Sequence, residues 1–172
     1  MRARALNNPR VQALLGAGGQ ADEAGSEDAR RYPNQRAFLF ASFSMPDQSL
    51  RQMMVDAQQY NVPIVFRGFV NNSVFDTQVA IQRVFGDDAE TIGFSIDPTL
   101  FTRFDIQSVP QVVVTRDDIE PCLMQACVGD FPPPHDKVSG NIPLLAVLDI
   151  VARADGDASG SAQRILNLEM PR

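Results

Sequence analysis

The stretch Ala37-Phe-Leu-Phe-Ala-Ser-Phe-Ser-Met-Pro-Asp47 decides the fold. It opens with a short, mostly apolar and aromatic run, which predicts a buried β-strand. Ser44 then stands where a helix N-cap would lie, with Pro46 in the first turn and Asp47 beside the positive end of the helix. Apolar residues follow at helical spacing from Leu50 onward. The stretch therefore predicts a strand, a tight turn and an amphipathic helix.

Strands and helices alternate through the rest of the middle of the chain. Further strands are expected at residues 62–66, 91–96, 111–115 and 136–139. Helices are expected at residues 72–85 and 98–104, and a last helix after Asn141, which would be its cap. This alternation predicts a parallel sheet covered on both faces, and the final strand pair predicts an antiparallel edge.

The two ends of the chain differ in composition from its middle. Residues 1–34 are rich in Ala, Gly, Arg and Asn, which predicts a flexible N-terminal arm. Residues 154–172 contain Asp155-Gly-Asp-Ala-Ser-Gly-Ser161, which is typical of a linker, and a short helix is expected from Ala162 to Leu168. We therefore expect one folded domain at residues 35–153.

Composition excludes several classes of protein. The 172 residues hold 15 Lys and Arg against 21 Asp and Glu, a formal charge of −6, whereas nucleic-acid readers carry a basic excess. His135 is the single histidine, so a multi-histidine metal site is impossible. No apolar run is long enough to cross a membrane. We expect no cofactor, no nucleic-acid partner and no membrane insertion.

The cysteines and the chain start bear on the cellular compartment. Cys122 and Cys127 suit one disulfide in an oxidising compartment, or two free thiols in a cytosolic protein. The residues after Met1 lack the apolar core of a signal peptide. This start fits either a cytosolic protein or a mature chain with a new initiator methionine.

Two stretches resemble thioredoxins. Ser44 and Asp47 stand where the two thiols of the thioredoxin W-C-x-x-C turn would be. Residues 97–114 are similar to the stretch that ends in the thioredoxin cis-proline loop, so we predict a cis peptide bond between Val109 and Pro110. The resemblance implies a thioredoxin-like α/β fold, with a mixed sheet of four to five strands, helices on both faces and a cis-proline loop.

A closer resemblance is to the TrbC family of F-type conjugative pilus assembly proteins. It covers about residues 40–153 and rests on Phe40-Ala-Ser-Phe-Ser-Met-Pro46, Arg67-Gly68, the stretch from Ile96 to Pro110 with its valine strand, and Val138-Ser-Gly-Asn141. The resemblance implies a periplasmic assembly factor of a conjugative type IV secretion system. Such a factor would bind other pilus-assembly proteins, for example a TraW-type partner, without catalytic turnover.

The residues themselves argue against thioredoxin chemistry at the turn. A serine hydroxyl stays protonated near neutrality, and Asp47 adds negative charge where a nucleophilic anion is disfavoured. The plain interpretation of Ser44 and Asp47 is a helix cap. What remains for function is a groove in which partner segments would bind, formed by Ser44, Met45, Pro46, Asp47, Arg67, Val109 and Pro110.

Several alternatives stay open at this point. Arg67 would reach a partner carboxylate, be an ordinary charge at the end of a strand, or pair within the chain with Asp97 or Asp105. Cys122 and Cys127 would be a structural staple or, in the main rival function, the catalytic pair of a thiol–disulfide oxidoreductase or isomerase. A hydrolase that uses Ser44 is a further rival.

Overall fold

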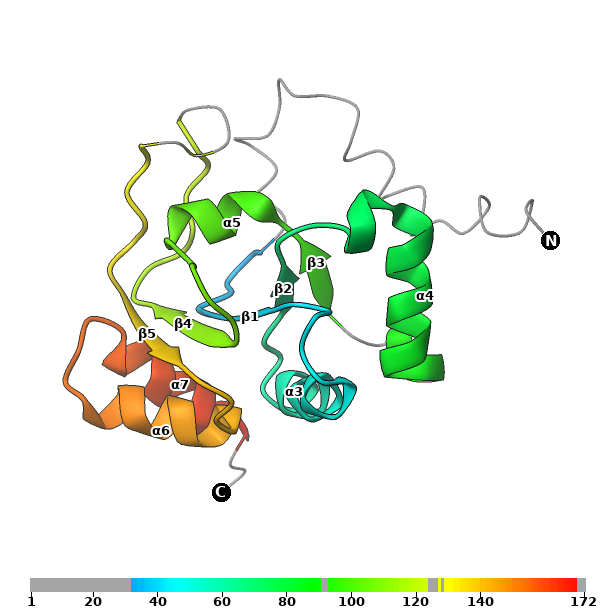
Figure 1. The fold of residues 1–172 in the computed structure, drawn as a ribbon. Coiled ribbons are helices and arrows are strands. Elements are labelled where there is room, and N and C mark those ends of the chain that lie inside the picture. The colour runs from blue at the N-terminus through cyan, green and yellow to red at the C-terminus, as the bar shows by residue number, and fades with distance from the viewer. Residues whose placement is uncertain (1–31, 91–92, 124–126, 128, 170–172) are drawn as a thin grey trace.

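The computed structural model describes residues 32–90, 93–123, 127 and 129–169. Within these ranges the chain forms a five-stranded sheet with helices on both faces (Figure 1). The strands are β1 (Ala37–Ala41), β2 (Ile64–Phe66), β3 (Phe94–Ile96), β4 (Gln111–Thr115) and β5 (His135–Ser139). The helices are α3 (Asp47–Gln59), α4 (Val74–Phe85), α5 (Pro98–Arg103), α6 (Leu144–Arg153) and α7 (Ser159–Glu169), with 3-10 turns η1 (Val70–Asn72) and η2 (Gly86–Glu90).

The sheet is mixed and has the strand order β3-β2-β1-β4-β5. Strand β2 runs parallel to β1 and to β3, whereas β4 runs antiparallel to β1 and to β5. The expected mixed α/β sheet is confirmed, but its antiparallel part is larger than the predicted edge pair. Parallel neighbours are usually joined by crossovers of about a dozen residues or more. The six-residue α5 instead leads into a strand that returns in the opposite direction.

Strand β1 is buried along its whole length because both faces of the sheet are covered. Ala37, Leu39 and Ala41 belong to a core shared with α3, α6 and α7. Phe38 and Phe40 belong to a second core on the opposite face, under α5. This two-sided burial explains why the strand is a continuous apolar run and does not alternate with polar residues.

Helix α5 is fixed on the second face by a buried carboxylate. Asp97 is its N-cap and accepts a hydrogen bond from the main-chain N–H of Thr99 at 3.0 Å. The hydroxyl of Tyr32 donates to Asp97 Oδ2 at 3.1 Å, and the Tyr32 ring is buried. Tyr32 is therefore packed against the folded domain, although it lies within residues 1–34, the segment that we expect to be a flexible arm. Residues 1–31 lie outside the described residues.

Helix α6 begins differently from the prediction. Asn141 is not its cap, because the N-cap is Pro143, which offers no side-chain hydrogen bond. The carboxylate of Asp56, on α3, accepts from the N–H of Leu144 at 3.0 Å, and Asn141 donates to the hydroxyl of Ser49 at 3.3 Å. Asp56, from another helix, thus accepts the hydrogen bond that a local N-cap side chain was expected to accept.

Helix α7 packs against α6 and is longer than the helix expected at residues 162–168 (Figure 1). Its first residues, Ser159-Gly-Ser161, have the composition of a linker. Ala158 and Ala162 are nevertheless fully buried in the same core as α6. Asp136 on β5 accepts a hydrogen bond from the N–H of Ala158 at 2.7 Å. Tertiary contacts therefore order a stretch whose composition favours a linker.

Candidate functional site

A cleft of about 650 Å³ lies where β1 and β2 end. Residues 41–44 begin at the last residue of β1 and residues 66–71 at the last residue of β2, and both segments line the cleft. Helix α4, Phe101 of α5 and the loop at residues 106–109 complete its walls. In open α/β sheets, ligands bind outside the carboxyl ends of parallel strands, and this cleft has that position.

Of the predicted site residues, the structure brings Ser44, Arg67 and Val109 together in the lining of this cleft. The peptide bond between Val109 and Pro110 is cis, as the sequence predicts. Met45, Pro46, Asp47 and Pro110 are not part of the lining. The candidate groove is thus centred farther toward α4 and Arg67 than the sequence indicates.

Ser44 does not cap α3, contrary to the prediction, and Asp47 makes no cap hydrogen bond, although it lies in the first turn of the helix as expected. Pro46 occupies the N-cap position and gives no side-chain hydrogen bond. The hydroxyl of Ser44 lies 2.9 Å from that of Ser42, and the main-chain N–H of Ser44 donates to the same Ser42 hydroxyl. Asp47 instead binds the guanidinium of Arg83 on α4, with Nε donating at 3.1 Å.

The lining offers little for catalysis. Its described titratable side chains are Arg67, Asp76 and Arg83, with no histidine, cysteine or lysine among them. His135 lies elsewhere, with its ring 5.0 Å from that of Phe104 and its Nδ1 hydrogen-bonded to the Pro133 carbonyl. The lining therefore offers Ser44 neither an imidazole nor an amine side chain as a general base.

Arg67 is exposed and stands over an aromatic ring. Its guanidinium carbon is 5.7 Å from the centroid of Phe101. No ion pair joins it to any described residue, so the structure does not support the alternative in which it pairs with Asp97 or Asp105. Asp97 caps α5, and Asp105 accepts a hydrogen bond from the side chain of Gln107. Arg67 thus brings to the cleft a cation that forms no ion pair with a described residue.

The apolar part of the cleft contains residues that sequence reasoning missed. Phe43 stacks on Phe66, with ring centroids 4.2 Å apart and planes 8° from parallel. On α4, Val79 lines the cleft and is 51% exposed, and Phe75, one turn earlier, is 71% exposed. The helical pattern of α4 includes both residues, but it does not show that they face solvent beside a cleft.

The main chain before the cis-proline is also available. Among the described residues, no hydrogen bond engages Val109, although the neighbouring Pro110 carbonyl accepts from the N–H of Gly140 at 3.0 Å. Val109 is half-buried at the rim of the cleft. An extended chain lying there would meet both a donor and an acceptor of the main chain.

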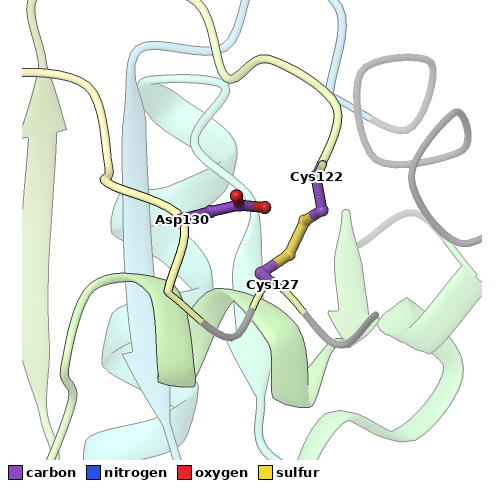
Figure 2. Close-up of side chains that lie close together, drawn as sticks. All are labelled: Cys122, Cys127 and Asp130. Atoms are coloured by element: carbon purple, nitrogen blue, oxygen red, sulfur yellow. A yellow bond between two sulfur atoms is a disulfide. The ribbon is translucent and has the colours of Figure 1, made fainter. Parts of the chain in front are cut away.

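Cys122 and Cys127 form a disulfide in the loop between β4 and β5, as the sequence predicts (Figure 2). Neither lines the cleft. Asp130 lies beside them and accepts a hydrogen bond from the N–H of Leu123 at 2.8 Å. Their ligand atoms and those of Asp130 lie within 4.8 Å of one another, but bonded sulfurs cannot act as thiolate ligands. The two cysteines therefore form a covalent cross-link within the loop.

None of the helices among the described residues combines the length and the apolar character that a membrane crossing needs.

Comparison with known proteins identifies the family. The model of the family described as type-F conjugative transfer system pilin assembly protein, TrbC, matches residues 39–151. Over 141 residues the chain is 38% identical to a protein of Escherichia coli (strain K12) named periplasmic protein TrbC. That match covers 82% of this chain and 58% of the relative, so the chain spans less than two thirds of the relative's length. No solved structure matches the chain. The chain belongs to the family of type-F conjugative transfer system pilin assembly proteins, and it is a periplasmic member of that family.

Proposed function

We propose that this protein is a non-catalytic assembly factor that works by binding other proteins of the conjugative system through the cleft beside Arg67. The family supports a role in pilus assembly. The observation that carries the binding role is the cleft itself, because it joins an apolar floor, an exposed cation and an unengaged main chain at Val109. These are the features by which domains hold extended partner segments.

The partners in this proposal are other pilus-assembly proteins, with a TraW-type protein among them. The proposed architecture is thioredoxin-like, with the cleft in the place of the thioredoxin active site. The mixed sheet, the helices on both faces and the cis bond before Pro110 support this assignment. The proposed interacting set is Ser44, Met45, Pro46, Asp47, Arg67, Val109 and Pro110.

Thiol–disulfide exchange by Cys122 and Cys127 is the rival function, and the geometry does not favour it. The pair lies outside the cleft; Cys127 is 2% exposed, whereas Cys122 is half-buried. Exchange requires that an attacking thiolate reach a sulfur along an open path. The disulfide therefore stays a structural staple in the proposal.

A pair of matched glycine variants tests the role of the cleft. Gly68 lines the cleft, and a Cβ built there meets nothing within 4 Å, so Gly68→Phe fills the cleft without a clash at the main chain. Gly160, exposed on α7, has equally open surroundings. Gly160→Phe is therefore the control.

The readouts are the conjugation frequency and the recovery of partners. In donor cells that carry the protein's own conjugative system, tagged full-length variants replace the wild type, and co-purifying envelope proteins are identified by mass spectrometry. We expect Gly68→Phe to lower the recovery of pilus-assembly proteins and the transfer frequency about tenfold or more, with Gly160→Phe unchanged. Full recovery of partners with Gly68→Phe would contradict the proposal, and so would catalytic turnover of a scrambled disulfide substrate.

A further inference from the structure

We propose that the cleft selects partner segments in which a carboxylate stands next to large apolar side chains, and that Arg67 is the residue that sets this preference. The inference rests on the proposed function and gives the chemistry of the partner segment. Three features of the described structure carry it: the charge of the lining, the support of the arginine and the apolar surface beside it.

The lining is positive in a chain that is negative overall. Two arginines and one aspartate line the cleft, whereas the formal charge of the whole chain is −6. Arg83 is paired with Asp47, and Asp76 accepts a hydrogen bond from the side chain of Asn71. Arg67 and Asp76 are thus the charged groups of the lining that form no ion pair with a described residue, and Arg67 is the one that stands over an aromatic ring. At Arg67, charge complementarity therefore favours an acidic group of the occupant over a basic or neutral one.

The support of Arg67 suits it to bind a carboxylate. The guanidinium stands 5.7 Å from the centroid of the Phe101 ring, a cation–π contact that restricts the long side chain. The Phe101 ring is itself held edge-to-face against Phe40, with centroids 4.9 Å apart. A guanidinium held by its face keeps its N–H groups in a fixed fork, which matches the two oxygens of a carboxylate.

The apolar surface next to Arg67 sets the second requirement. The stacked Phe43 and Phe66 rings line the cleft, and exposed Val79 and Phe75 extend this surface along α4. An ion pair with an exposed arginine is worth little in water. Large apolar side chains that cover these rings would exclude water from the pair and strengthen it. Affinity would therefore come mainly from apolar contact, and Arg67 would supply the choice between acidic and neutral segments.

A peptide selection tests this preference directly. A displayed library of random heptapeptides is selected on the full-length protein, and the enriched sequences are read for wild type, Arg67→Glu and Arg164→Glu. Arg164 is also exposed but lies on α7 outside the cleft lining, so it is the matched control. We expect Asp or Glu beside large apolar residues for wild type and for Arg164→Glu. For Arg67→Glu we expect Lys or Arg in that place.

Affinity measurements on one selected peptide complete the test. Fluorescence anisotropy is recorded for the peptide and for its analogue with the acid replaced by the amide. Arg67→Gln should weaken binding of the acidic peptide about tenfold and leave that of the amide analogue nearly unchanged. Gly68→Phe should abolish the binding of both.

The outcomes separate this inference from the proposed function. Peptides that bind without a charge preference, and still lose binding with Gly68→Phe, would overturn the role of Arg67 and leave the cleft as the binding site. Selection of no peptide would also overturn the inference. The measurements of conjugation frequency and of partner recovery would then decide the proposed function separately. An unchanged preference in Arg67→Glu would overturn it as well.

Discussion

Gly156 lies against a carboxylate that holds the start of the C-terminal helix. A Cβ at this position would stand 2.5 Å and 2.6 Å from the two carboxylate oxygens of Asp136, which is too close for a carbon and an oxygen that are not bonded to each other. The same carboxylate accepts the hydrogen bond from Ala158. We expect Gly156→Ala to lower the free energy of unfolding by about 1–3 kcal/mol, measured by urea denaturation, because the clash displaces this hydrogen bond.

Gly160→Ala is the control for this variant. Gly160 lies in α7, and a Cβ there meets nothing within 4 Å. Alanine in a helix is more favourable than glycine by about 0.5–1 kcal/mol, so this variant should be neutral or slightly stabilising. Equal urea midpoints for the two variants would contradict the argument from the Asp136 carboxylate.

Single residues also show how far the sequence predicts the site. The hydroxyl of Ser44 and the acid of Asp47 were enough to exclude thiol exchange at the turn. Their actual partners, Ser42 and Arg83, were not predictable, because Arg83 lies on another helix, 36 residues along the chain from Asp47. Local cap propensity therefore predicted the wrong role for Ser44, whereas Asp47 does lie in the first turn of α3, where its charge was expected.

At the scale of elements, the junction of α3 and α6 depends on one carboxylate. Asp56 on α3 accepts from the N–H of Leu144, the first residue of α6, where its charge also favours the positive helix end. Asp56→Ala should lower the free energy of unfolding by about 1 kcal/mol, as loss of a helix cap usually does. Chemical denaturation followed by circular dichroism measures the change.

Asp149→Ala provides the comparison on the same helix. Among the residues that the structure describes, Asp149 pairs only with Arg153, one turn along α6. Such i,i+4 pairs contribute about 0.3–0.5 kcal/mol. A loss of stability at Asp149 as large as that at Asp56 would show that the inter-helix hydrogen bond has no special role.

The elements themselves were largely predictable, and their surroundings were not. Strands β1 and β4 are each buried over all five residues. A continuous apolar run is the sequence pattern expected of a strand whose two faces are both covered. The direction of β4 and the packing of α7 depend on contacts between distant segments. The exposed side of α4 likewise carries Phe75 and Val79, which periodicity alone would place in the core.

At the scale of the whole molecule, the disulfide and the cleft should be separable. Cys122 and Cys127 are five residues apart, and closing so short a loop stabilises a protein by about 2 kcal/mol in the chain-entropy model. The double variant Cys122→Ser and Cys127→Ser should therefore stay folded and lose about that amount of stability. Its recovery of pilus-assembly partners should equal that of the wild type.

The same co-purification assay measures this outcome, with urea denaturation as the check on folding. The Gly68→Phe variant is the contrasting control, because it should keep stability and lose partners. A folded double variant that fails to recover partners would show that the loop between β4 and β5 is itself an interface. That result would move the binding surface away from Arg67.

The two faces of the sheet are covered unequally, and this asymmetry bears on motion. Helices α3, α6 and α7 cover one face, whereas the six-residue α5, with Tyr32 and Ile119, covers the other. So short a helix has little stability of its own, so local opening should start there. Amide protons near Phe101 should exchange with deuterium sooner than those near Leu148. Each such opening would release the Phe101 ring beneath Arg67. Local opening of α5 would therefore limit how long the guanidinium keeps one orientation.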